Sequence, residues 1–127
     1  MTVIPDADHS LETGDALRDF QILQQVMPAY KDADMIVYGS PIYYSNLTAQ
    51  LSAAMQRIYP IGKPAKATKA ALLLSSAAPG PYTGAISAYQ AAVGFMGLED
   101  VGVLCAAGEE NGSAAKMEEI RAFAKAL

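Results

Sequence analysis

The stretch DADMIVYGSPIYYSNLTAQL, residues 32–51, contains the clearest structural signal in the chain. Its apolar run, residues 35–38, shows no alternation of polar and apolar side chains, which is typical of a parallel strand covered on both faces. The run ends at Gly39, Ser40 and Pro41, and a segment with helical spacing follows. A strand, a stiff turn and a helix in this order indicate one repeat of an alternating β and α architecture.

The same order occurs twice more toward the C-terminus. The sequence predicts helices at about 46–58, 81–96 and 113–127, and two further strands at 69–77 and 101–108. Alternating strands and helices, with strands of the buried type, predict a parallel sheet joined by right-handed crossovers. The predicted fold class is therefore α/β.

The segment before residue 32 predicts a lead and a first helix. We expect an irregular lead over 1–14, with Asp15 as the cap of the helix that follows, and one domain over 15–127. Apolar residues recur in that helix at a spacing of three or four positions: Leu17, Phe20, Leu23, Met27 and Tyr30. Pro28 lies inside this pattern, so we expect a kink or an early end there.

Composition excludes several classes of function. Of the 127 residues, 52% are hydrophobic, and the net charge is −4. The sequence contains no cluster of Lys and Arg, which argues against a nucleic-acid partner. The apolar stretches are far shorter than the roughly 20 residues of a membrane span, and the first residues lack the pattern of a secretory signal. We therefore expect a cytoplasmic protein. Cys105 is the single cysteine, and we expect it to be a buried, inert thiol with no disulfide or metal.

Three loops are candidates for binding a ligand, because ligands of open parallel sheets bind beyond the carboxyl ends of the strands. They are loops 39–46, 75–84 and 107–113. In the first loop, Tyr43 and Tyr44 offer aromatic faces, and Asn46 either caps the next helix or binds a ligand. Alternatively, the tyrosines only cover the end of the sheet. The residues alone leave both interpretations open.

Residues 29–58, AYKDADMIVYGSPIYYSNLTAQLSAAMQRI, resemble the third strand, loop and helix of NADPH-dependent FMN reductases, in particular their iron–sulfur flavoprotein-like branch. The resemblance continues through IGKPAKATKAALLLSS, residues 61–76, into the next strand. The residues at matching positions are Ala33, Asp34, Gly39, Ser40, Pro41, Tyr43, Leu51 and Arg57.

This resemblance implies a flavodoxin-like, three-layer α/β/α fold that binds FMN and uses NADPH or NADH as co-substrate. The residues implied to border the flavin ring are Ser40, Pro41, Ile42, Tyr43, Tyr44 and Asn46. Those implied to contact its pyrimidine edge are Ser75, Ser76, Ala77, Ala78, Pro79 and Gly80. The implied reaction is hydride transfer from the nicotinamide to FMN and on to an acceptor. Because the flavin performs this step, no catalytic side chain and no metal ion are expected.

The chain also departs from the family pattern. The residues before 15 do not match the family's first strand and phosphate loop, and the cysteine cluster of the iron–sulfur branch is absent. Ser52 and Gln56 stand where the family has Lys and Asp. The fold is thus expected to be truncated at its N-terminus, with the strand at 35–39 on an open edge. Because such edges tend to pair with another chain, we expect a homodimer or larger homo-oligomer. The alternative to an FMN reductase is a non-catalytic, flavodoxin-like assembly or interaction domain without FMN.

Overall fold

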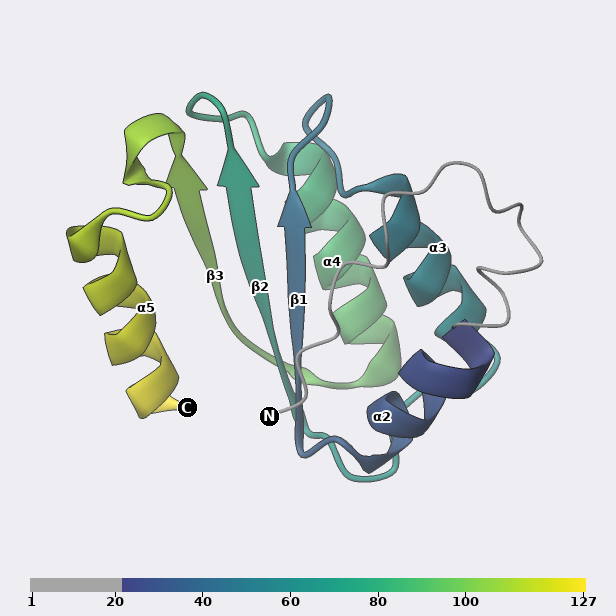
Figure 1. Ribbon diagram of the computed structural model, residues 1–127. Helices are drawn as coiled ribbons and strands as arrows, with labels where there is room; N and C mark the ends of the chain where they lie inside the picture. Colours follow the sequence, from purple (N-terminus) through teal and green to yellow (C-terminus); the bar gives the residue numbers. More distant parts are fainter. Residues whose placement is uncertain (1–21) are drawn as a thin grey trace.

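The computed structural model describes residues 22–127, and these contain one parallel sheet of three strands (Figure 1). The strands are β1 (Met35–Pro41), β2 (Lys69–Ser76) and β3 (Glu99–Ala107), and they lie in the order β1-β2-β3. Val37 pairs with Ala71 in β2, and Leu73 pairs with Leu104 in β3. Parallel pairing with intervening helices confirms the predicted α/β class.

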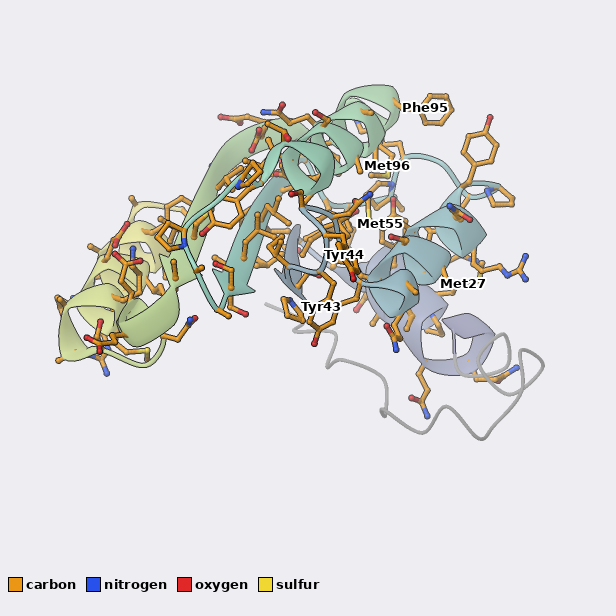
Figure 2. The ribbon with its side chains drawn as sticks, turned by 90° about the horizontal axis from the view of Figure 1, so that it is seen from above. Met27, Tyr43, Tyr44, Met55, Phe95 and Met96 are labelled. Atoms are coloured by element: carbon orange, nitrogen blue, oxygen red, sulfur yellow. The ribbon has the colours of Figure 1, made fainter. Side chains whose placement is uncertain are left out.

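The helices lie on both faces of this sheet. They are η1 (Ile22–Val26), α2 (Met27–Asp32), α3 (Ala49–Ile58), α4 (Thr83–Met96), η2 (Gly108–Glu110) and α5 (Ala114–Ala126). Figures 1 and 2 together show α4 behind the sheet with α3 beside it, and α5 on the opposite face next to β3. Among the described residues, no helix is long and apolar enough to cross a membrane.

The main core lies between the sheet and helices α3 and α4. Every second residue of β1 points into it, since Ile36, Tyr38 and Ser40 are buried and their neighbours are not. The other fully or nearly fully buried side chains of this core include Leu72, Leu74, Ala85, Tyr89 and Val93. Burial of this kind stabilises a fold by about 25 cal/mol per Å² of apolar surface, so this core fixes α4 on the sheet.

The opposite face of the sheet is less covered than the sequence predicted. Val37 and Leu73 are only half-buried, Gly39 is exposed, and α5 contributes no fully buried side chain within residues 22–127. The expectation that β1 is covered on both faces is therefore wrong for the part of the chain that the structure describes. The apolar run reflects one buried and one half-buried face.

Most element boundaries agree with the sequence, and the differences have local causes. α4 ends at Gly97, whose φ of 65° suits glycine, and the Ser113 side chain caps α5 as predicted. Pro28 lies in the first turn of α2, which follows the π-helical η1 directly, so the change from π-helical to α-helical spacing falls next to this proline. The lead over 1–14 and the helix start at Asp15 lie outside the described residues.

A β-bulge in β3 shifts its pairing with β2. Ala70 pairs with Asp100 but Leu72 pairs with Val103, so β3 holds one extra residue between these two pairs. Gly102, at the bulge, has a φ of 139°, and an added Cβ there would lie 3.0 Å from the Phe123 ring of α5. The bulge thus lies directly against the Phe123 ring of α5.

Candidate functional site

The candidate site lies at the carboxyl ends of the strands, where three loops meet at the top of Figure 1. Loop 42–48 follows β1, loop 77–82 follows β2, and loop 108–113 follows β3. Because the three strands are parallel, these loops gather at one end of the sheet, which is where α/β proteins bind ligands. Below, residues 42–46 are called the tyrosine loop.

The tyrosine loop is a tight turn that exposes two aromatic rings. The Tyr43 N–H donates to the Asn46 carbonyl oxygen at 3.3 Å, and the Asn46 N–H donates to the Tyr43 carbonyl oxygen at 3.1 Å. Tyr44 and Ser45 both have left-handed backbones, with φ of 50° and 62°. The Tyr43 side chain is 61% exposed and that of Tyr44 is fully exposed (Figure 2). The loop therefore presents both rings beyond the end of the sheet.

Hydrogen bonds fix the base of the tyrosine loop. The buried Ser40 hydroxyl oxygen accepts from the Thr48 N–H at 3.0 Å, and the hydroxyl donates to the Pro41 carbonyl oxygen at 2.7 Å. The Ile42 N–H donates to the Ser75 carbonyl oxygen at 2.8 Å, which attaches the loop to β2. Ser40 is thus buried, and its hydroxyl orders the backbone at the base of the loop.

The helix cap belongs to Thr48 and not to Asn46, which the sequence had suggested as a possible cap. Thr48 Oγ1 accepts from the Leu51 N–H at 3.2 Å and begins α3 at Ala49. The Asn46 side chain is exposed, and its Oδ1 accepts from the Leu47 N–H at 2.8 Å. The Asn46 side chain therefore bonds inside the loop, and its amide nitrogen points to no protein partner that the structure records.

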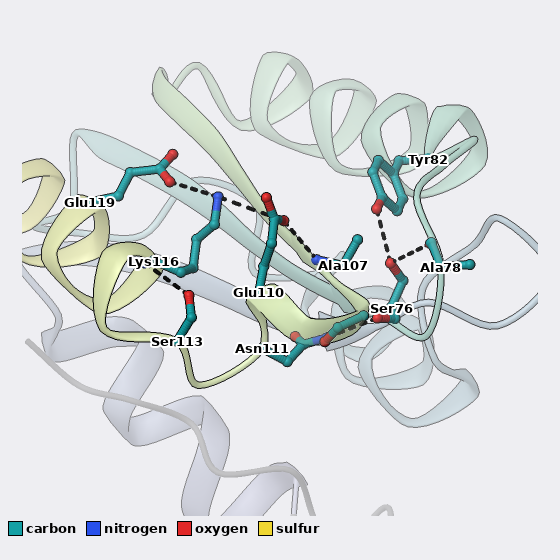
Figure 3. A network of polar contacts seen from close by, with 10 residues as sticks. Ser76, Ala78, Tyr82, Ala107, Glu110, Asn111, Ser113, Lys116 and Glu119 are labelled. Atoms are coloured by element: carbon teal, nitrogen blue, oxygen red, sulfur yellow. Dashed lines mark hydrogen bonds and ion pairs between the residues drawn. The ribbon is translucent and has the colours of Figure 1, made fainter.

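The second loop is anchored at Ser76 and is otherwise exposed. The Ser76 hydroxyl donates to the Ala78 carbonyl oxygen at 2.8 Å and lies 2.9 Å from the Tyr82 hydroxyl (Figure 3). Residues 77–80 are exposed, whereas Ser75 is half-buried in the sheet. Backbone groups of 77–80 are consequently accessible to a ligand. Tyr82 did not stand out in the sequence, because nothing there links it to Ser76.

The third loop is held by a polar network that the sequence did not reveal. The Asn111 amide nitrogen donates to the Ser76 carbonyl oxygen at 2.8 Å and to the Gly108 carbonyl oxygen at 3.0 Å (Figure 3). Glu110 Oε2 accepts from the Ala107 N–H at 3.0 Å. Lys116 Nζ lies 2.6 Å from Glu119 Oε2, and this bond raises the Lys116 pKa. These contacts give Glu110 and Asn111 structural roles at the ends of β2 and β3.

Cys105 is half-buried, and its surroundings disfavour the thiolate. Burial is the main cause that raises the pKa of its thiol, and the nearby Lys116 ammonium offsets this effect only in part. A raised thiol pKa agrees with the predicted inert cysteine. Within residues 22–127, no group of three His, Cys, Asp or Glu side chains is arranged to hold a metal ion.

A separate apolar cavity lies at the other end of the molecule. It has a volume of about 200 Å³ between the C-terminal halves of α3 and α4, and its wall includes Met55, Tyr59, Phe95 and Met96. Figure 2 shows Phe95 and Met96 well away from Tyr43 and Tyr44. The rings of Tyr59 and Phe95 stack 5.3 Å apart at its entrance. This cavity is therefore not part of the loop site.

The loop site suits a flat aromatic ligand with a polar edge better than it suits a phosphate. Two exposed tyrosine rings allow stacking, and the open backbone of 77–80 offers donors and acceptors for a heterocycle edge. None of the loops 42–48, 77–82 and 108–113 contains a lysine or arginine. The residues therefore fit the ring system of FMN, and no cation in these loops fits its phosphate.

A family model and three solved structures resemble this chain. The model of the NADPH-dependent FMN reductase family matches residues 6–104, which is most of the chain. No curated protein matches the sequence. The Trp repressor binding protein of Bacillus subtilis superposes with a TM-score of 0.52 at 13% identity, over 73% of this chain and 75% of its own length.

Two further structures superpose equally well. The FMN-dependent NADH-azoreductase of Bacillus anthracis, solved in complex with FMN, has a TM-score of 0.52 at 22% identity. The match covers 75% of this chain and 52% of the azoreductase, so the chain spans about half of that protein. A tryptophan halogenase of Streptomycin violaceusniger has a TM-score of 0.52 at 19% identity, and the match covers 77% of this chain and 66% of the halogenase. Such low identities show a shared fold and leave the activity open.

Proposed function

The chain belongs to the NADPH-dependent FMN reductase family, and from this we propose that it is a flavin-dependent oxidoreductase that takes a hydride from NADPH or NADH. We place FMN at the carboxyl ends of β1 and β2. The observation that carries the proposal is the tyrosine loop, which exposes Tyr43 and Tyr44 on a hydrogen-bonded turn at this end of the flavodoxin-like sheet. Large exposed aromatic side chains on a rigid turn are available to a ligand rather than to the core.

The two loops would hold the flavin ring in different ways. Tyr43 or Tyr44 would stack on the ring face, since an offset aromatic stack adds about 0.5–1.5 kcal/mol beyond buried area. Residues 77–80 would bond the pyrimidine edge through their exposed backbone. Ser40, Pro41, Ile42 and Ser75 would act indirectly, because their recorded hydrogen bonds order the backbone between β1 and β2. The Asn46 amide nitrogen would offer the ligand a further side-chain donor, since only the Asn46 Oδ1 has a recorded bond within the loop.

When bound, FMN supplies the redox chemistry, accepting a hydride from the nicotinamide and delivering electrons to an acceptor. The chain's own contribution is to bind the ring, orient it and shield one face of it from water. No proton transfer by a side chain is required for this step. A cationic partner for the phosphate would have to come from outside the three loops, because these loops carry no lysine or arginine.

We also propose that the chain forms a homo-oligomer through the open edge of β1. Within residues 22–127 the sheet order is β1-β2-β3, so no described strand pairs with the outer edge of β1. Unpaired strand edges present backbone donors and acceptors that readily pair with another strand. A cytoplasmic location stays a prediction, which fractionation of cells that produce the protein would check.

Titration of the purified full chain with FMN tests the proposed function. We expect FMN fluorescence to be quenched on binding, and we expect NADPH or NADH to be oxidised when FMN and an artificial electron acceptor are both present. Tyr44→Ala should weaken FMN binding roughly tenfold, as expected for the loss of one aromatic stack. Its control is Tyr59→Ala, because Tyr59 is 66% exposed but lies at the distant cavity.

Equal effects of the two substitutions would contradict the assigned place of the flavin. A colourless protein that binds no added FMN would contradict the proposed function itself. That second result would favour the alternative of a non-catalytic, flavodoxin-like interaction domain.

A further inference from the structure

We propose that Gly84 is a positioning residue for the tyrosine loop. Its missing side chain lets the Ser45 carbonyl group rest on the first turn of α4, which fixes Tyr43 and Tyr44 beside loop 77–82. The contact itself is independent of any ligand. Only its consequence for flavin binding rests on the proposed function.

The space at Gly84 leaves no room for a side chain. An added Cβ would lie 2.7 Å from the Ser45 carbonyl oxygen, 3.5 Å from the Ser45 carbonyl carbon and 3.5 Å from Asn46 Cγ. The nearest atom belongs to the backbone, so it cannot rotate away as the end of a flexible side chain could. Even an alanine at 84 must therefore displace the peptide group between Ser45 and Asn46.

The same carbonyl group is held by a hydrogen bond. The Ala85 N–H, one of the N-terminal amides of α4 that have no partner within the helix, donates to the Ser45 oxygen at 2.9 Å. Ala85 is completely buried, so water does not compete for this bond. Gly84 thus allows the Ser45 carbonyl group to approach α4, and the Ala85 N–H donates a hydrogen bond to it.

The backbone of the tyrosine loop needs such an anchor. Tyr44 and Ser45 are consecutive non-glycine residues with φ of 50° and 62°. Left-handed conformations of this kind persist where the surrounding structure enforces them. On one side the loop is closed by the two bonds between Tyr43 and Asn46, and on the other the Ser45 carbonyl is bound to α4.

The anchor also connects the two halves of the candidate site. α4 begins at Thr83, directly after loop 77–82, and the Tyr82 hydroxyl lies 2.9 Å from the Ser76 hydroxyl. The first turn of α4 therefore touches the tyrosine loop and continues from the second loop. A displacement at Gly84 would separate the tyrosine rings from the exposed backbone of 77–80.

Gly84→Ala tests the inference, with Gly94→Ala as its matched control. Both glycines lie in α4, but an added Cβ at Gly94 meets nothing within 4 Å. In the ligand-free protein we expect Gly84→Ala to speed amide hydrogen exchange over residues 42–46 by at least about tenfold, with β2 and β3 unchanged. We expect the Kd for FMN to rise by about tenfold, the effect of one or two lost hydrogen bonds. Gly94→Ala should change neither quantity.

Unchanged exchange over 42–46 in Gly84→Ala would overturn the inference. If Gly84→Ala does not fold, Ser45→Gly in the same chain should restore folding, because a glycine at 45 lets its peptide group turn away from Ala at 84. Failure of that restoration would equally overturn it. If the wild-type chain binds no FMN, the proposed function fails, while the exchange comparison still tests the role of Gly84.

Discussion

The Tyr89 hydroxyl is a buried polar group whose partner lies at the bulge of β3. Tyr89 has no exposed surface, and its hydroxyl donates to Asp100 Oδ1 at 2.9 Å. The same oxygen accepts from the Gly102 N–H at 3.1 Å. Burial, followed by the bond to Asp100, raises the pKa of Tyr89. One side chain therefore connects the centre of α4 to the irregular part of the sheet.

We expect Tyr89→Phe to lower the free energy of unfolding by about 1–2 kcal/mol, because a hydrogen bond to a carboxylate is lost in a packed site. Chemical denaturation followed by circular dichroism measures this value. Tyr43→Phe serves as control, since Tyr43 is 61% exposed, and its change should stay within about 0.5 kcal/mol. Equal effects of the two substitutions would show that the bond to Asp100 contributes nothing to stability.

The segment from β1 to α3 shows what the sequence could and could not predict. The apolar run located the strand, because its pattern is local. The turn predicted at residues 39–41 is wrong, since these residues continue β1 and pair with β2, and the turn follows at 42–46. The N-cap residue of α3 could not be predicted, because Asn46 and Thr48 both precede the helix and both residue types cap well. Only the folded loop distinguishes them: its left-handed turn at Tyr44 and Ser45 directs the Asn46 side chain to Leu47. The contact between Gly84 and Ser45 could not be predicted from the sequence, because it depends on tertiary structure.

Thr48→Ala should therefore destabilise the protein by about 1 kcal/mol, the usual cost of losing a helix N-cap. Thr48→Ser keeps the hydroxyl oxygen that accepts from the Leu51 N–H, and it should retain most of the stability. The measurement is the midpoint and slope of urea unfolding for both variants. A serine variant as unstable as the alanine variant would mean that the methyl group of the buried Thr48 matters more than its cap.

The sheet as a whole is covered unequally, and its β1 edge is open among the described strands. α4 and α3 close one face, whereas Val37 and Leu73 on the other face stay half-buried. The alternation of strands and helices predicted a parallel sheet, and the family resemblance predicted the strand at 35–39 on its open edge. It could not predict how much of the second face α5 covers, because α5 is amphipathic in pattern yet buries no residue completely.

Gly39→Lys tests assembly through the β1 edge. Gly39 is exposed and an added Cβ meets nothing within 4 Å, so the monomer accommodates the lysine. Lysine on an edge strand opposes pairing with another strand. By light scattering at micromolar concentration, we expect a homo-oligomer for the wild type and a smaller species for Gly39→Lys. Gly94→Lys, which adds the same charge on open space in α4, should leave the mass unchanged. A monomeric wild type would contradict the proposed assembly.

The extra residue in β3 determines which of its side chains belong to the core. Beyond the bulge, Val103 and Cys105 pack toward the same core as Leu72 and Leu74, and Leu104 points to the α5 side. Deleting Val101 or Gly102 would advance the rest of β3 by one place and exchange these two sets of side chains. A sequence alignment that places a single-residue gap here would hence pair inward positions of one protein with outward positions of another.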